Sequence, residues 1–220
     1  MRIPIAREGY PFILAALVLA IILWVLDARV GFYHLFYPAI SLFLFVVWFF
    51  RDPEREIPTG EGDIVSPADG KVIKVEEVDD DRFLKTKAIK ISVFMNVFNV
   101  HVNRAPTDGV VEKIIYNPGK FINASFDKAS LENEQNALII NAGDGGGGDG
   151  RRYVANQIAG LIARRIVCRV KEGDTLTRGA RFGLIRFGSR LDVFLPTTAR
   201  PVVKVGEKVS AGSSVLATWQ

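Results

Sequence analysis

Residues 184–196 read Leu184-Ile185-Arg186-Phe187-Gly188-Ser189-Arg190-Leu191-Asp192-Val193-Phe194-Leu195-Pro196, which places a Gly-Ser pair between two strand-like apolar runs. Alternation of apolar and polar side chains is typical of a β-strand with one buried face. Similar short runs recur through the chain after residue 60, separated by Gly, Pro and Asp: Lys71–Val75, Ala88–Val93, Gly109–Ile115, Ala137–Ile140, Arg165–Val170 and Ser214–Ala217. The sequence therefore predicts a mainly β (α+β) domain with antiparallel strands.

Two segments share a glycine pattern, and a third contains a tight turn. Val170–Ala180 and Val203–Ala217 follow a V-x-x-G-(D/E)-x-(L/V)-x-x-G spacing, and Asp63–Val72 contains a further tight turn. Glycines at these intervals favour turns, and the apolar residues between them fall on one face. The segments resemble hairpins of lipoyl and biotinyl-type barrels, so we expect a sandwich or barrel-like fold. Residues 153–158 remain open between strand and helix.

The N-terminal 50 residues have a different composition. Two apolar runs, Pro11–Leu26 and Phe32–Phe50, are joined by the short polar segment Asp27–Gly31. Each run approaches the ~20 residues that a helix needs to cross a bilayer. Because arginines precede the first run and follow the second, both ends are expected on the cytoplasmic side. Residues 1–50 are thus predicted to be a membrane-anchoring helical hairpin, and residues 51–220 a cytoplasmic domain; a hairpin that only dips into one leaflet is the alternative.

Charge and cysteine content exclude several kinds of site. The net charge of +4 is too small and too evenly spread to indicate nucleic-acid binding. Cys168 is the single cysteine, so neither an intramolecular disulfide nor a cysteine-based metal site is possible. No metal site is predicted.

The Gly188-Ser189 pair has its own chemistry. A serine hydroxyl can attack the preceding carbonyl in an N→O acyl shift, and glycine eases the strained geometry because it lacks a Cβ. Elimination from the resulting ester cuts the chain and leaves the former serine as an N-terminal pyruvoyl group. Gly-Ser alone is a weak signal, and it gains weight from two upstream motifs, Ser66–Gly70 (SPADG) and Phe98–Pro106 (FNVHVNRAP).

With these motifs in this order, the chain resembles the phosphatidylserine decarboxylase family, in its short, membrane-anchored bacterial form. The similarity runs from about Arg51 to about Ala217. The resemblance implies a proenzyme that cuts itself between Gly188 and Ser189, turns Ser189 into the covalent pyruvoyl cofactor, and keeps its two chains together as a heterodimer. It also implies the bacterial inner membrane as location, while a higher oligomer remains open.

The resemblance also implies roles for individual residues. The pyruvoyl group derived from Ser189 would form a Schiff base with the amine of phosphatidylserine and accept electrons as carbon dioxide leaves. His101 would act as base in self-cleavage and as proton donor in decarboxylation. Asp69 would orient the imidazole and stabilise its cation. Longer relatives carry a second histidine at the position of Arg104, so both proton transfers are expected to fall on His101.

Several alternatives remain at this point. A cationic side chain is expected on the headgroup phosphate, and Arg104, Lys120 and Arg190 are equal candidates. Gly212-Ser213 is a second Gly-Ser pair, but it ends a hairpin turn and no alternating strand follows it. The substrate could be another serine phospholipid, such as an archaetidylserine-like ether lipid. A non-catalytic, membrane-tethered barrel-sandwich adaptor is the alternative from a different class of protein.

Overall fold

The structure is a computed structural model that describes residues 3–30, 34–120, 124, 132–143, 151–160, 165–186 and 188–220. The chain divides into two compact units, Met1–Glu54 and Arg55–Gln220. This division lies close to the change in composition after Phe50.

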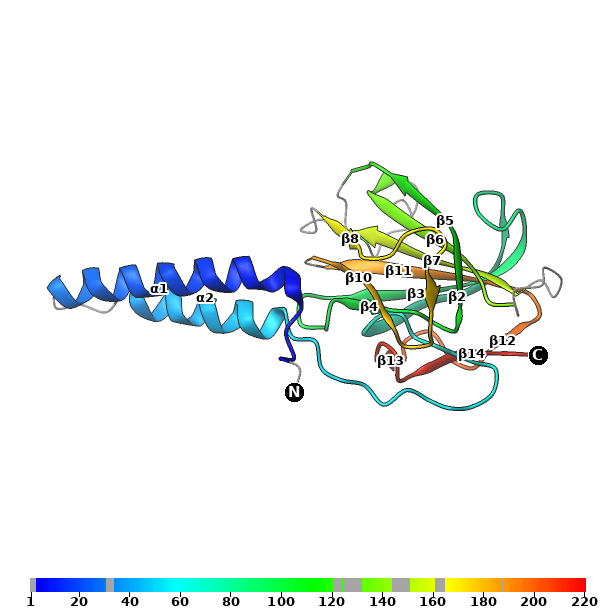
Figure 1. The fold of residues 1–220 in the computed structure, drawn as a ribbon, viewed down its shortest axis with the longest axis horizontal. Coiled ribbons are helices and arrows are strands. Elements are labelled where there is room, and N and C mark those ends of the chain that lie inside the picture. The colour runs from blue at the N-terminus through cyan, green and yellow to red at the C-terminus, as the bar shows by residue number, and fades with distance from the viewer. Residues whose placement is uncertain are drawn as a thin grey trace. The chain divides into compact units, whose positions relative to one another are not determined.

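The first unit is a pair of helices that lie side by side (Figure 1). A 3-10 turn, η1 (Arg7–Gly9), leads into α1 (Tyr10–Val30), and α2 (Phe36–Phe49) follows. The stretch Arg7–Val30 is long and apolar enough to cross a membrane. At 1.5 Å per residue, the 14 residues of α2 span only about 21 Å, less than the ~30 Å of hydrocarbon. The predicted pair of helices is confirmed, but the second is shorter than its apolar run.

Asp27 explains where α2 begins. Its carboxylate lies in the last turns of α1 and accepts hydrogen bonds from the backbone amides of Leu35, at 3.0 Å, and Phe36, at 2.8 Å. A carboxylate satisfies the unpaired amides at a helix N-terminus and complements its positive dipole end. Asp27 is consequently a buried acidic residue with a structural function at the turn of the hairpin.

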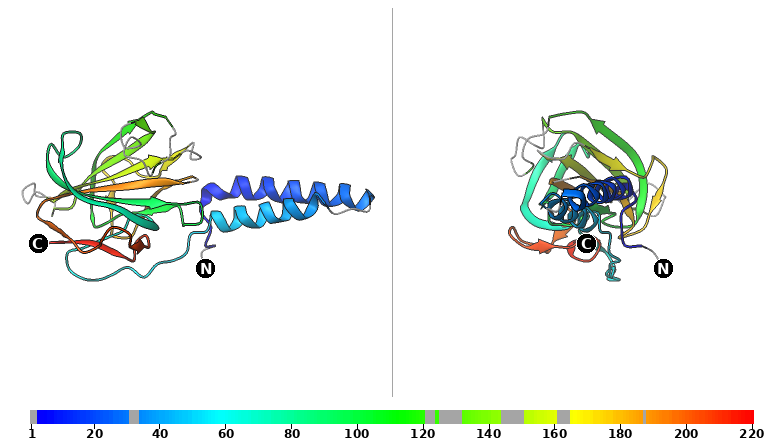
Figure 2. Two further views of the ribbon diagram at one scale, coloured as in Figure 1. Left: turned by 180° about the vertical axis from the view of Figure 1, so that it is seen from behind. Right: turned by 90° about the vertical axis from the view of Figure 1, so that its left-hand side faces the viewer.

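The second unit is built from antiparallel strands in three sheets. One sheet joins β1 (Asp63–Val65), β14 (Val215–Trp219) and β12 (Ala199–Pro201), and another joins β4 (Val102–Arg104), β10 (Arg181–Ile185) and β8 (Ile166–Cys168). The largest sheet has the order β13 (Lys208–Val209), β2 (Gly70–Asp80), β3 (Thr86–Met95), β11 (Ser189–Pro196), β7 (Arg152–Ala159), β6 (Gln135–Asn141), β5 (Gly109–Asn117) and β9 (Thr175–Leu176). The views in Figure 2 show these strands curling around a common interior, which confirms the mainly β, antiparallel prediction.

Strand β11, orange in Figure 1, lies in the middle of the largest sheet and pairs with β3 on one side and β7 on the other. The alternating side chains of β11 fall on opposite faces of the sheet, as a strand predicts. Leu191, Val193 and Leu195 enter the main hydrophobic core, whereas Phe194 packs in a second cluster on the opposite face. The stretch with the Gly-Ser pair therefore supplies a central strand, and Ser189 is its first residue.

Residues 153–158, for which the sequence left strand and helix open, belong to strand β7. This strand is paired on both sides, by β11 and β6, and the tertiary pairing decides the conformation. The glycine pattern of the two predicted hairpins is also explained. Gly173 and Gly206 have φ values of 89° and 98°, a region that other residues rarely adopt.

Candidate functional site

The Gly188-Ser189 bond lies beside the imidazole of His101. The backbone amide of Gly188 donates a hydrogen bond to Nε2 of His101 over 3.3 Å. His101 comes directly before β4 and is buried. Gly188 has a φ of 67°, so the backbone turns in the left-handed region immediately before β11 begins.

The hydrogen bonds of His101 define its tautomer. Nδ1 lies 2.9 Å from the carbonyl oxygen of Asn99, which can only accept a hydrogen bond, and Nε2 faces the Gly188 amide, which can only donate one. The proton is consequently assigned to Nδ1, and Nε2 carries the lone pair. A neutral imidazole in this orientation places a proton acceptor at the Gly188 amide, one residue before Ser189.

Ser189 is fully buried, and its Oγ has no hydrogen-bond partner within the described part of the chain. An unsatisfied buried hydroxyl costs about 1–3 kcal/mol, so its retention needs a reason other than stability. The site thus combines a buried hydroxyl without a partner and, one residue earlier, a backbone amide that contacts an imidazole.

Gly160 packs against the carbonyl of the same bond. A Cβ built on Gly160 would lie 2.2 Å from the Gly188 carbonyl oxygen and 3.4 Å from Cβ of Ala124. The first distance is far below any tolerable contact, and the oxygen belongs to the backbone. Residue 160 must therefore lack a side chain for the Gly188 carbonyl to take this position.

Asp69 is held by two groups. Its two carboxylate oxygens accept hydrogen bonds from the same nitrogen of Arg55, Nη2, at 2.9 and 2.8 Å, and Oδ1 accepts a third from the Ala211 amide at 2.8 Å. Both Asp69 and Arg55 are largely shielded from solvent. The carboxylate is thus fixed in place, with its charge balanced by Arg55.

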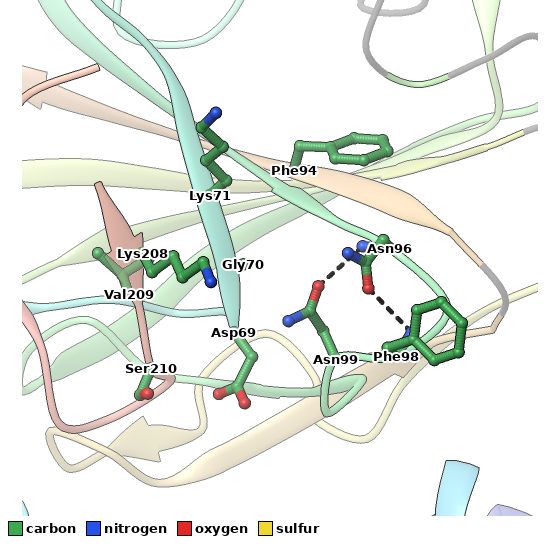
Figure 3. A pocket seen from close by; sticks show the side chains of 10 residues that line it. All are labelled: Asp69, Gly70, Lys71, Phe94, Asn96, Phe98, Asn99, Lys208, Val209 and Ser210. Atoms are coloured by element: carbon green, nitrogen blue, oxygen red, sulfur yellow. Dashed lines mark hydrogen bonds between the residues drawn. The ribbon is translucent and has the colours of Figure 1, made fainter. Parts of the chain in front are cut away.

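A cavity of about 460 Å³ lies beside Asp69. Asp69 lines it on one side, and Asn99, whose carbonyl contacts His101, lines it on the other (Figure 3). The remaining lining residues come from the starts and ends of three strands and the turn after β3: Gly70, Lys71, Phe94, Asn96, Phe98, Lys208, Val209 and Ser210. Ser189 pairs with Met95, which lies between Phe94 and Asn96.

The three cationic residues that were candidates to bind the headgroup phosphate lie outside this cavity. Arg190 is completely buried and pairs with Asp192, with 2.9 Å between Nε and Oδ1. The Arg104 guanidinium is also buried and donates to the Gly179 carbonyl at 3.0 Å. Lys120 is exposed and pairs with Glu132 at 3.1 Å. None of the three lines the cavity.

The second Gly-Ser pair has different surroundings. Gly212 also has a positive φ, of 76°, but its amide donates to the Ser66 carbonyl at 2.7 Å. The Ser213 amide bonds to the Ser210 carbonyl within the same turn. Gly212-Ser213 is thus part of a hairpin turn, as the sequence suggested.

Several residues that line the cavity were not predicted from the sequence. Lys71 directly follows the SPADG motif and Asn99 precedes His101 by two residues, so motif proximity was an available signal for both. Lys208 gave no such signal. It reaches the cavity because β13 pairs with β2, a long-range contact that local patterns do not reveal.

The chain is similar to known proteins over nearly its whole length. A family model described as phosphatidylserine decarboxylase matches residues 42–217. Three similar curated proteins are each named phosphatidylserine decarboxylase proenzyme, from Ralstonia pickettii (53% identical), Cupriavidus pinatubonensis (52%) and Burkholderia pseudomallei (52%). Each alignment spans 213 residues and covers 97% of this chain and 94% of the relative.

Proposed function

The chain belongs to the phosphatidylserine decarboxylase family, a family of carboxy-lyases, and on this basis we propose that it cuts itself between Gly188 and Ser189 and decarboxylates phosphatidylserine to phosphatidylethanolamine. One observation carries the assignment of the site: the Gly188 amide contacts Nε2 of His101 beside the unpartnered hydroxyl of Ser189. A non-catalytic adaptor would need neither feature, and the family match favours the enzyme.

Self-cleavage begins at the Ser189 hydroxyl. Nε2 of His101 takes the hydroxyl proton, and Oγ attacks the Gly188 carbonyl carbon. The bond from that carbon to the Ser189 nitrogen breaks, and the nitrogen takes up a proton. The product is an ester between Gly188 and the Ser189 side chain. Gly160 assists because the developing oxyanion on Gly188 meets no side chain at that position.

Elimination then separates the two chains. A proton leaves Cα of residue 189, the Cβ–O bond breaks, and Gly188 departs as a new C-terminal carboxylate. Water replaces the nitrogen of residue 189, which leaves as ammonia, and a pyruvoyl group remains. When formed, this group supplies the electron sink that decarboxylation of an amino acid headgroup needs.

His101 and Asp69 complete the proposed machinery. After carbon dioxide has left, His101 delivers a proton to the α-carbon of the headgroup, since it is the one histidine in the sequence after residue 34. Asp69 is assigned to orient the imidazole and stabilise its cation, because it lines the same cavity as Asn99, whose carbonyl contacts Nδ1 of His101. Its bonds to Arg55 and Ala211 keep the carboxylate in position.

The two chains, 1–188 and 189–220, remain together as a heterodimer. The smaller chain contributes β11, which is hydrogen-bonded to β3 and β7 and buries Leu191, Val193 and Leu195. Burial of three such side chains stabilises the association by several kcal/mol, at about 1.5–3 kcal/mol each. No covalent link between the chains is required.

We further propose that α1 holds the protein at the bacterial inner membrane with the second unit in the cytoplasm. A diacyl substrate resides in the bilayer, and arginines flank the apolar segments on the expected cytoplasmic side. Protease treatment of sealed inverted vesicles should digest residues 55–220. Protection of these residues in such vesicles would contradict the orientation.

Carbon dioxide release tests the activity. Full-length protein in neutral detergent should liberate labelled carbon dioxide from carboxyl-labelled phosphatidylserine, and Ser189→Ala protein should not. An ether-linked serine phospholipid is assayed in parallel, because the headgroup chemistry is identical. A wild-type protein that matures but releases carbon dioxide from neither lipid would contradict the proposal.

A further inference from the structure

A row of buried amide side chains leads through the core toward Ser189. Nδ2 of Asn136 donates to Oε1 of Gln157 at 3.0 Å, and Nε2 of Gln157 donates to Oδ1 of Asn103 at 2.8 Å. All three residues are buried. Because the side-chain oxygen of Asn103 accepts from Gln157, the orientation of this amide is fixed, and its NH₂ group forms the far end of the row.

The NH₂ group of Asn103 has a poor acceptor. Nδ2 lies 3.9 Å from Sδ of Met95, which is its one partner within the described part of the chain. A thioether is a weak acceptor, and both residues are completely buried, so this donor lacks a good hydrogen bond. Buried polar groups in native proteins are nearly always well paired, and an exception calls for a reason.

Met95 also adjoins Ser189. The two residues are direct antiparallel partners on β3 and β11. Direct partners project from the same face of a sheet, with their Cβ atoms about 4.5–5.5 Å apart. This is the core face, because Met95 and Leu191, two residues after Ser189, both belong to the main hydrophobic core. The unpartnered Ser189 hydroxyl and the poorly paired Asn103 donor therefore adjoin the same side chain.

Asn103 is connected to the cleavage site along its own strand as well. It is the second residue after His101, whose Nε2 accepts from the Gly188 amide. Methionine is unbranched and flexible, so the Met95 thioether can turn aside. Rotation about the Cα–Cβ bond of Ser189 can then bring Oγ to the NH₂ group, while Gln157 continues to hold the Asn103 oxygen.

We propose that Asn103 donates a hydrogen bond to Oγ of Ser189 during elimination and stabilises the negative charge that develops there. In this step a base removes the proton from Cα of residue 189, the electron pair forms a Cα–Cβ double bond, and the Cβ–Oγ bond breaks with its electron pair on Oγ. Gly188 leaves as a carboxylate that contains Oγ. A hydrogen bond strengthens as its acceptor becomes charged, so the donor lowers the barrier. This inference rests on the proposed self-cleavage and adds the residue that acts on its leaving group.

Asn103→Asp and Asn103→Leu test the proposal in the full-length protein. Aspartate has the shape of asparagine and still accepts from Gln157, but its carboxylate has no hydrogen to donate, and leucine can neither accept nor donate. Met95→Leu is the matched control, because leucine fills a similar volume and leaves the Asn103 donor in place. Circular dichroism checks folding, and gel filtration in detergent isolates the folded fraction of each variant.

We expect both Asn103 variants to slow elimination about 100-fold, the effect typical of removing one donor from a developing negative charge. The ester then accumulates. Hydroxylamine should split it into a chain 1–188 that ends in a hydroxamic acid and a chain 189–220 that begins with an intact serine. Intact mass distinguishes these products from those of self-cleavage. Met95→Leu should cut at the wild-type rate without accumulating ester.

Three results would overturn the inference while the proposed function stands. Cleavage of Asn103→Asp at the wild-type rate would assign Asn103 a structural role. Folded, uncut variants that resist hydroxylamine would place the block before the ester, and ester accumulation in Met95→Leu would assign the effect to core packing. A wild-type chain that stays uncut would instead contradict the proposed function itself.

Discussion

Nε2 of His101 accepts a hydrogen bond from the Gly188 amide across 3.3 Å, although the two residues are 87 positions apart in the chain. The contact exists because the turn that ends in His101 and the turn that starts β11 lie next to each other. It places the lone pair of a neutral imidazole at the amide of Gly188, one residue before the serine that the family resemblance marks for cleavage.

Substitution of His101 should block maturation. We expect His101→Gln to reduce the rate of self-cleavage by at least about 100-fold, because glutamine retains hydrogen bonding but cannot take up a proton. Gel analysis of freshly induced protein over time measures the uncut fraction. Hydroxylamine, which cleaves an ester, then shows whether the acyl shift or the elimination is blocked. Cleavage of His101→Gln at the wild-type rate would leave the histidine a structural residue.

The role of Asp69 can be separated from that of its partner Arg55. Asp69→Asn removes the negative charge but keeps an acceptor for the Ala211 amide, and it should slow maturation about tenfold. Arg55→Met removes the guanidinium and leaves the carboxylate. If the charge of Asp69 matters for the imidazolium, Arg55→Met retains cleavage better than Asp69→Asn. Equal loss in both variants would show that the ion pair serves only to hold the fold.

Gly160→Ala should leave the chain folded but uncut. The added methyl group would overlap the Gly188 carbonyl oxygen, so this carbonyl must shift away from its present position. Gly173→Ala is the control: it has open space around it but a positive φ, so it costs about 1–2 kcal/mol of stability without touching the site. Circular dichroism reports folding and intact mass reports cleavage. Normal cleavage in Gly160→Ala would contradict the positioning role.

The buried Tyr153 predicts loss of stability at alkaline pH. Burial raises the pKa of Tyr153 well above its usual value of 10.0, and its hydroxyl donates to the Thr107 carbonyl. Because the folded-state pKa is the higher one, this contribution is complete below pH 10 and is lost as the pH rises further, by about 1.4 kcal/mol per pH unit. Denaturant unfolding of full-length protein in detergent between pH 9 and 11.5 measures the slope. Tyr153→Phe should reduce it, and an unchanged slope would assign it to other groups.

Much of the fold follows from local patterns. The alternation at residues 191–195 correctly predicted which side chains of β11 face the main core, since successive side chains of a strand point to opposite faces. The apolar runs at residues 11–26 and 32–50 correctly predicted two helices. The length of α2 was not predictable from hydrophobicity, because it depends on where the Asp27 carboxylate meets the chain again.

The candidate site was predictable only in part. Ser189, His101 and Asp69 were chosen from motifs, and the structure places His101 in contact with Gly188, the residue before Ser189. Asp69 pairs with Arg55, and the sequence offered no sign of this pairing. Gly160 and Lys208 reach the site through contacts between distant strands, and a single sequence does not specify such contacts.

Intact-mass spectrometry of the full-length protein tests the central claim most directly. The account predicts two chains, one ending at Gly188 and one of residues 189–220 whose N-terminus is blocked by a pyruvoyl group and therefore resists Edman degradation. Ser189→Ala should give a single uncut chain. A cut before Ser213, or a wild-type protein that remains one chain of 220 residues, would contradict the account.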